Sequence, residues 1–266
     1  MNVRMPAVSG QFYPSKKEEL DSTLKALFRE EKLEEVASEG IAPHAGYVYS
    51  GRIAAKTIAK MKKQTFVILS PNHTGLGSEI SLSESDYWAT PLGEVPVNKK
   101  IAKGIVERAK AEFDESAHIA EHSIEVLIPF IQHRFSGEKI DIVPVTIGTS
   151  YYEDLKKLAE ALASVAEKHS FNLLASSDFS HFIPLKYAKE RDLLAIKFIQ
   201  KLDAEGFYNT VQTKGLSICG FAPITTTILY CRLLGRKKCK LLAYDTSATA
   251  SGDKSSVVGY ASLIFF

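Results

Sequence analysis

Four short polar clusters contain the side chains of this sequence that could bind a metal ion or move protons. They are residues 43–46, 71–73, 177–181 and 218–220. Three of the clusters follow short apolar runs, at residues 40–42, 66–69 and 173–176, that predict buried strands. Ligands of α/β sheets bind beyond the carboxyl ends of the strands, so we expect the clusters to converge at one end of one sheet.

Two histidines and one cysteine are the candidate metal ligands, namely His44, His73 and Cys219. Gly46 permits a sharp turn after His44, and Cys219 lies just before a predicted helix, where a thiol has a lowered pKa. Imidazole and thiolate together are ligands for transition metals. Each residue taken alone fits a packing or surface role better than a metal ligand, so the metal hypothesis depends on their convergence.

Asp178 and His181 are the candidates for proton transfer. If a helical turn follows the strand, residues three apart share one face, and the carboxylate can orient an acid/base histidine. A helix-capping Asp178 beside an ordinary polar histidine is the alternative interpretation. Asn72 is expected to hydrogen-bond the neighbouring histidine, since ligand histidines need a partner that fixes their tautomer.

Glu121 and His122 open a further predicted helix, where carboxylates suit the helix dipole. A cationic His122 is unfavourable there, so we expect a neutral imidazole facing the pocket. The remaining histidines are interpreted as surface residues, namely His118, His133 and His169. The sequence contains no serine-hydrolase elbow, phosphate-binding loop or dinucleotide fingerprint.

The composition is that of an ordinary globular protein. The chain has 266 residues, 45% hydrophobic and 24% charged, and a formal net charge of +2, which gives no reason to expect nucleic-acid binding. Three cysteines without a Cys-x-x-Cys pair predict a reducing, cytoplasmic location. No signal peptide is recognisable, and the apolar stretch 257–266 is too short to cross a bilayer, so we expect no membrane association.

Strands and amphipathic helices alternate along the chain. Helices are predicted at residues 51–60, 98–110, 151–169, 185–202 and 223–234, besides a helix that a capping box at residues 15–18 would start. Further strands are predicted at 66–69, 142–147, 173–176, 241–244 and 257–266. This alternation predicts an α/β fold, one domain over residues 1–266, whose largely parallel or mixed central sheet is covered by helices.

Several blocks of the sequence resemble, in order, those of the Memo family, also called AmmeMemoRadiSam system protein B. The blocks are residues 4–14, 42–47, 70–73, 121–125, 176–181 and 218–220. Their fixed order over nearly the whole chain makes the match far more specific than any one of them.

The resemblance implies a fold similar to class III extradiol dioxygenases, which are non-haem iron enzymes. It implies that His44 and His73 match the two histidine ligands of those enzymes and that His181 matches the acid/base histidine. Asp178 and His122 belong to Memo blocks that line the same pocket. Cys219 stands where those enzymes have a glutamate, and because a thiolate is softer and oxidisable, ring cleavage does not follow.

Three functions remain open. The first is a metal-dependent redox protein with Fe(II) or Cu and an unidentified substrate. The second is a binding or adaptor protein whose relic pocket takes a small molecule or a peptide, with AMMECR1-like and radical-SAM proteins as partners by family association. The third is a hydrolase that uses Zn²⁺ held by His, Asp and Cys.

Overall fold

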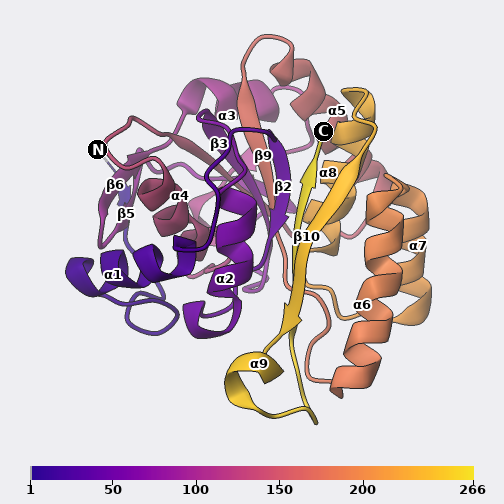
Figure 1. Cartoon of the computed structure of the whole chain (residues 1–266). Coiled ribbons are helices and arrows are strands. Elements are labelled where there is room, and N and C mark those ends of the chain that lie inside the picture. The colour runs from indigo at the N-terminus through magenta and orange to yellow at the C-terminus, as the bar shows by residue number, and fades with distance from the viewer. Residues whose placement is uncertain (1) are drawn as a thin grey trace.

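The computed structural model describes residues 2–266, which form a large mixed sheet with helices on both faces (Figure 1). Four neighbouring parallel strands make its centre: β2 (Glu39–Ala42), β9 (Phe171–Ser176), β3 (Thr65–Pro71) and β8 (Ile142–Ile147). The predicted α/β class with a mixed sheet is therefore confirmed.

Antiparallel strands extend this centre on both sides. On one side β11 (Gly259–Phe265) pairs with β2, and β10 (Cys239–Thr246) forms the edge. On the other side β4 (Ile80–Leu82) pairs with β8, and the short β7 (Glu112–Phe113) forms the edge. A separate sheet contains β1 (Val3–Arg4), β5 (Tyr87–Thr90) and β6 (Gly93–Pro96).

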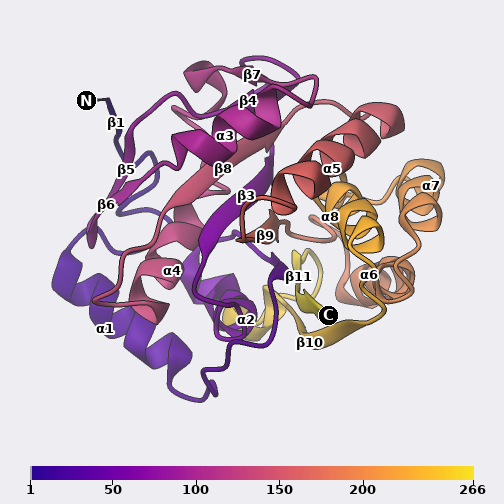
Figure 2. The same ribbon diagram turned by 90° about the horizontal axis from the view of Figure 1, so that it is seen from above.

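The helices form a layer on each face of the large sheet, as Figure 2 shows from above. One layer contains α3 (Lys99–Val106), α5 (Tyr152–Ala166), α6 (Leu185–Gln200), α7 (Ala204–Lys214) and α8 (Phe221–Leu233). The other contains α1 (Lys17–Phe28), α2 (Tyr47–Ile58) and α4 (Ile128–Arg134). Short turns of helix complete the chain: η1 (Glu115–Ala117), η2 (Glu125–Leu127) and α9 (Ala248–Ser251).

A separate hydrophobic core lies on each face of the sheet. Along β3, Val67 and Leu69 belong to the core under α5 and α8, whereas Phe66 and Ile68 belong to the core under α2 and α4. This alternation follows from the pleat, which points successive side chains to opposite faces. All four side chains are fully buried, which explains why the strand reads as one continuous apolar run.

Most predicted elements are present, with differences at their ends and in the loops. Asn98 caps α3, since its side chain accepts a hydrogen bond from the backbone N of Ile101 at 3.0 Å. The predicted capping box of α1 is wrong, because Lys16 takes the cap position and no side chain caps the helix. Residues 177–181 form a loop instead of a helical turn, and regular structure after Glu121 begins only at η2.

The sequence pattern did not predict α7. Among residues 2–266, no helix combines the length and the apolar character that a bilayer crossing requires.

Candidate metal centre

Three of the predicted chemical clusters follow neighbouring parallel strands of the sheet. His44 comes two residues after β2, His73 two residues after β3, and Asp178 two residues after β9. Because β9 lies between β2 and β3 and all three run parallel, these side chains lie at the carboxyl ends of the strands, on the same end of the sheet. The fourth cluster ends at Gly220, directly before α8.

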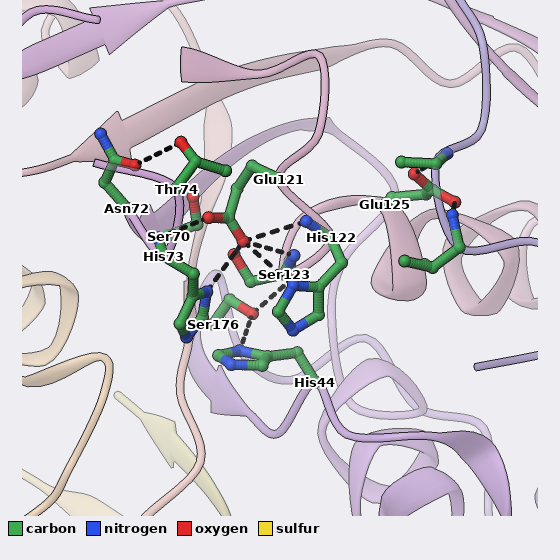
Figure 3. A network of polar contacts seen from close by, with 12 residues as sticks. His44, Ser70, Asn72, His73, Thr74, Glu121, His122, Ser123, Glu125 and Ser176 are labelled. Carbon is green, nitrogen blue, oxygen red and sulfur yellow. Dashed lines mark hydrogen bonds and ion pairs between the residues drawn. The ribbon is translucent and has the colours of Figure 1, made fainter. Parts of the chain in front are cut away.

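The rings of His44, His73 and His122 form a compact cluster at these strand ends (Figure 3). Each offers one ring nitrogen, and the three nitrogens lie within 4.8 Å of one another. The ring centroids are 4.8–5.4 Å apart, and the rings of His73 and His122 are stacked. His122 comes from the loop before η2. Three imidazoles at this separation are an arrangement that could hold one transition-metal ion.

The buried carboxylate of Glu121 orients this cluster. Its oxygens accept hydrogen bonds from the backbone N of His73 at 2.6 Å and from His73 Nδ1 at 2.9 Å. They also accept bonds from the backbone N of His122 and from both donors of Ser123. Since a carboxylate only accepts, Nδ1 of His73 carries the proton and Nε2 is free to bind a metal.

A serine fixes the tautomer of His44 in a similar way. Ser176, the last residue of β9, donates its hydroxyl proton to the carbonyl of Ser123 at 2.6 Å. The same oxygen lies 2.8 Å from His44 Nδ1, so it accepts a hydrogen bond from the protonated Nδ1. Nε2 of His44 is therefore unprotonated and available as a ligand.

The surroundings keep the rings of His44 and His122 uncharged. Burial lowers the pKa of His44 well below its usual value, and repulsion from the other two histidines lowers it further. Burial likewise lowers the pKa of His122, although Glu121 partly opposes this. Burial alone would raise the pKa of Glu121, but the hydrogen bonds from His73 and Ser123 outweigh it and lower that pKa to about 2. A charged carboxylate with neutral imidazoles is the protonation state that metal binding requires.

Cys219 lies beside His44 but outside the group of three nitrogens. Its sulfur is 3.3 Å from His44 Nε2 and accepts a hydrogen bond from the backbone N of Asp178 at 3.3 Å. Burial, followed by repulsion from Asp178, raises the pKa of this thiol, so the lowered pKa expected at a helix N-terminus is wrong. A neutral thiol here can donate its proton to the free Nε2 of His44. Its role as a metal ligand stays a prediction.

Asp178 and His181 occupy the loop after β9. Asp178 is buried and accepts a hydrogen bond from the backbone N of His44 at 2.9 Å, so it holds the turn that carries this histidine. Burial raises the pKa of Asp178 to about 6. His181 is partly exposed, and its ring Nδ1 lies 2.7 Å from the carbonyl of Ser217. The acid/base roles of both residues stay predictions.

The surroundings of Asn72 and His118 differ from those expected from the sequence. Asn72 bonds the loop that follows it, through Thr74, Gly75 and Leu76, and Glu121 takes the place beside His73 that was expected of Asn72. His118, interpreted as a surface residue, is fully buried. Its Nε2 lies 3.2 Å from the carbonyl of Ser81 and its Nδ1 3.2 Å from the hydroxyl of Thr146.

Ser176 and Phe12 were not identified from the sequence, although both touch the cluster. Ser176 ends an apolar strand and opens one block of the family resemblance, but its residue type alone predicts no role at a metal site. The ring of Phe12 lies 4.9 Å from that of His122, and this contact depends on how the N-terminal segment folds back. Phe12 likewise belongs to the opening block of the family resemblance, at residues 4–14.

The mixed sheet and its strand-end histidines define an α/β protein with a candidate metal centre. An uncharacterized protein of Escherichia coli K12 shares the fold, with a TM-score of 0.60 at 14% identity over 85% of this chain and 98% of that one. The family model described as "Memo-like protein" matches residues 4–264, and this chain belongs to that family.

Relatives in the same family are similar over their full length. A MEMO1 family protein of Methanosarcina barkeri is 40% identical, covering 98% of this chain and 99% of its own length. A MEMO1 family protein of Desulfurococcus amylolyticus is 42% identical over the whole of both chains.

Proposed function

We propose that the chain is a metal-dependent redox protein whose ion, Fe(II) or Cu, is held by His44, His73 and His122. The three ring nitrogens within 4.8 Å of one another carry this proposal. The donor set fits, because imidazole suits iron, copper and zinc alike, and hydrogen bonds fix the free nitrogens of two of the rings. A bound ion would supply Lewis acidity and a redox couple at the carboxyl ends of the strands.

The residues around the cluster have separate tasks in this proposal. Glu121 and Ser176 orient two of the imidazoles, and Asp178 holds the backbone of the turn that carries His44. Cys219, beside His44 Nε2, would add a sulfur ligand once its proton is lost. His181 would accept a proton from a small substrate and later return it, because the hydrogen bond from its Nδ1 to a carbonyl leaves Nε2 without a proton in the neutral ring.

Anaerobic purification followed by metal analysis tests this function. The wild-type chain is expected to carry about one ion, and His44→Ala, His73→Ala and His122→Ala are each expected to lose most of it. His133→Ala is the matched control, because that ring contacts Asp21 away from the cluster. Unchanged metal content in all three cluster variants would end the proposal.

The absorption spectrum of the loaded protein tests the sulfur ligand. A thiolate-to-metal charge-transfer band that Cys219→Ser abolishes would place the sulfur on the ion. Cys231→Ser is the control, since that thiol is fully buried in the core cluster under α8. An identical spectrum in Cys219→Ser would restrict the ligands to nitrogen.

A binding role remains the second proposal, because Phe12, which packs against His122, also lines a pocket. It has a volume of about 770 Å³ and lies between the N-terminal loop, α1, α2 and α9. Phe12 lines this pocket and also packs against His122, so a small molecule or a peptide held there would touch a residue that contacts the cluster. Stoichiometric binding of such a ligand by chelator-treated protein would favour this role over redox chemistry. AMMECR1-like and radical-SAM partners stay predictions.

A further inference from the structure

Another buried carboxylate, Asp192 on α6, contacts the loop that carries His181. It is 1% exposed, and no role in metal binding involves it. Its Oδ1 accepts hydrogen bonds from the backbone N of Ser180 at 3.0 Å and from the Ser180 hydroxyl at 2.6 Å. Its Oδ2 accepts a bond from the hydroxyl of Tyr244 on β10 at 2.8 Å. The Asp192 carboxylate therefore accepts three hydrogen bonds, and two of them come from Ser180, the residue before His181.

Backbone hydrogen bonds to Gly259, the first residue of β11, also hold the loop. The backbone N of Phe179 donates to the carbonyl of Gly259, and the backbone N of Gly259 donates to the carbonyl of Ser180, both at 2.8 Å. A side chain at position 259 would collide with Oδ2 of Asp192, so this close approach requires glycine. Ser180 is thus fixed between a strand end and a carboxylate.

The residue after His181 shows why such fixing is needed. Phe182 has a φ of 56°, in the left-handed region that bulky side chains rarely adopt. Its side chain is 75% exposed, so burial of the ring does not stabilise this backbone conformation. A loop that contains a strained residue keeps one geometry only where surrounding contacts determine it.

The fixed loop presents His181 in a single ring orientation. The backbone N of His181 donates to the Ser217 hydroxyl at 2.9 Å, and Nδ1 lies 2.7 Å from the Ser217 carbonyl. A carbonyl only accepts, so Nδ1 is protonated and Nε2 of the neutral ring carries a lone pair. Residues 217–220 also reach the cluster, since Cys219 contacts His44 and Gly220 donates to the Ser177 hydroxyl.

We propose that Asp192 is a positioning residue for His181: by holding Ser180 it keeps the His181 ring on the Ser217 carbonyl, with Nε2 as the free proton acceptor. The inference rests on the proposed function only in giving His181 a proton-transfer task. Asp192 acts through Ser180 and touches none of the three cluster histidines.

Long-range ¹H–¹⁵N correlation spectra of the histidine rings in the full-length chain, without added metal and with diamagnetic Zn²⁺, test this role. Wild-type His181 is expected to show the neutral form protonated at Nδ1. Asp192→Ala and the milder Ser180→Ala are expected to give a mixture of both tautomers. Asp192→Asn keeps an oxygen that can accept from Ser180 and is expected to restore the wild-type pattern.

Asp203→Ala is the matched control, because Asp203 caps α7 through the backbone N of Gly206 and contributes stability alone. It is expected to lower the melting temperature without changing the His181 tautomer. The positioning role is overturned if Asp192→Ala and Ser180→Ala both retain the wild-type tautomer, or if Asp203→Ala alters it equally. Metal content is expected to stay at the wild-type level in Asp192→Ala, so failure of the metal site and failure of this role are separate results.

Discussion

At the scale of single residues, Glu121 decides how the candidate centre is organised. One carboxylate accepts hydrogen bonds from His73, His122 and Ser123, so it joins two of the three histidine positions. Carboxylates behind ligand histidines fix the ring orientation and raise the basicity of the ligand nitrogen. The cluster therefore depends on a residue that is not one of the three imidazoles.

Glu121→Gln is expected to weaken metal binding by about 10–100-fold, because the amide keeps the shape of the side chain and loses its charge. Competition with a chromophoric chelator measures this affinity. Glu115→Gln is the control, since that carboxylate accepts from the Ser83 hydroxyl and the backbone of Glu84, outside the cluster. Equal affinities in wild type and Glu121→Gln would show that Glu121 has no orienting effect.

His118 gives a residue-scale prediction on pH. Burial lowers its pKa to about 4 in the folded chain, against about 6.5 when it is exposed in the unfolded chain. The folded state thus binds fewer protons, and the stability that this histidine contributes is present above pH 6.5 and lost as pH falls toward 4. Urea unfolding of chelator-treated protein is expected to show a loss on the order of 2 kcal/mol over this window.

In His118→Gln that loss is expected to become smaller, whereas the partly exposed His169→Gln should keep the wild-type profile. Parallel pH profiles for wild type and His118→Gln would contradict the assignment.

The residues found from the sequence differ in kind from those that were missed. His44 and His73 were identifiable because each follows a recognisable apolar strand and carries a side chain with metal chemistry. His122 was recognised as a pocket residue only, since nothing local shows that its loop folds over the ends of β2 and β3. Ser176 acquires its role from two contacts more than fifty residues distant, which no local pattern encodes.

At the scale of elements, local signals succeeded where a side chain bonds its own helix. Asn98 was predicted to cap α3 and does so, because the interaction spans only three residues. The capping box at residues 15–18 has suitable residue types, yet Lys16 is the cap residue of α1. The strand and helix alternation predicted the α/β class, but the antiparallel β10, β11 and β4 depend on long-range pairing that periodicity does not show.

The two helix starts give a paired prediction. Asn98→Ala is expected to destabilise the chain by about 1 kcal/mol, the usual effect of losing an N-cap acceptor. Asn98 also donates to Asp141 at 2.8 Å, so Asn98→Ser, which keeps a capping oxygen and loses that bond, separates the two contributions. Ser15→Ala is expected to change the stability by less than about 0.5 kcal/mol. Thermal unfolding measures all three, and a larger effect at Ser15 than at Asn98 would refute the cap assignment.

At the scale of the whole molecule, one buried ion pair ties the N-terminal segment to the loop of the candidate centre. Arg4 Nη1 lies 2.5 Å from Glu125 Oε2, and both side chains are buried. Glu125 also accepts bonds from Tyr13 and from the backbone of Ala7 and Val8, and Arg4 stacks over Trp88. The segment held in this way places Phe12 against His122. The Arg4–Glu125 ion pair therefore supports both the overall fold and the candidate site.

Glu125→Gln is therefore expected to cost about 3 kcal/mol or more, because it leaves the Arg4 guanidinium buried without its counter-charge. The double variant Arg4→Met/Glu125→Gln is expected to be less destabilised than the two single effects added together, since the two side chains touch. Removing the exposed pair between Lys16 and Glu19 is expected to cost at most about 1 kcal/mol. Urea unfolding of the four variants measures these differences.

The same ion pair predicts a link between stability and metal binding. Because the loosened segment withdraws Phe12 from His122, Glu125→Gln is expected to lower metal affinity as well, whereas Lys16→Ala should leave it unchanged. Chelator competition at a temperature where every variant is folded separates this effect from unfolding. Wild-type affinity in a folded Glu125→Gln chain would mean that the N-terminal segment stabilises the molecule without shaping the site.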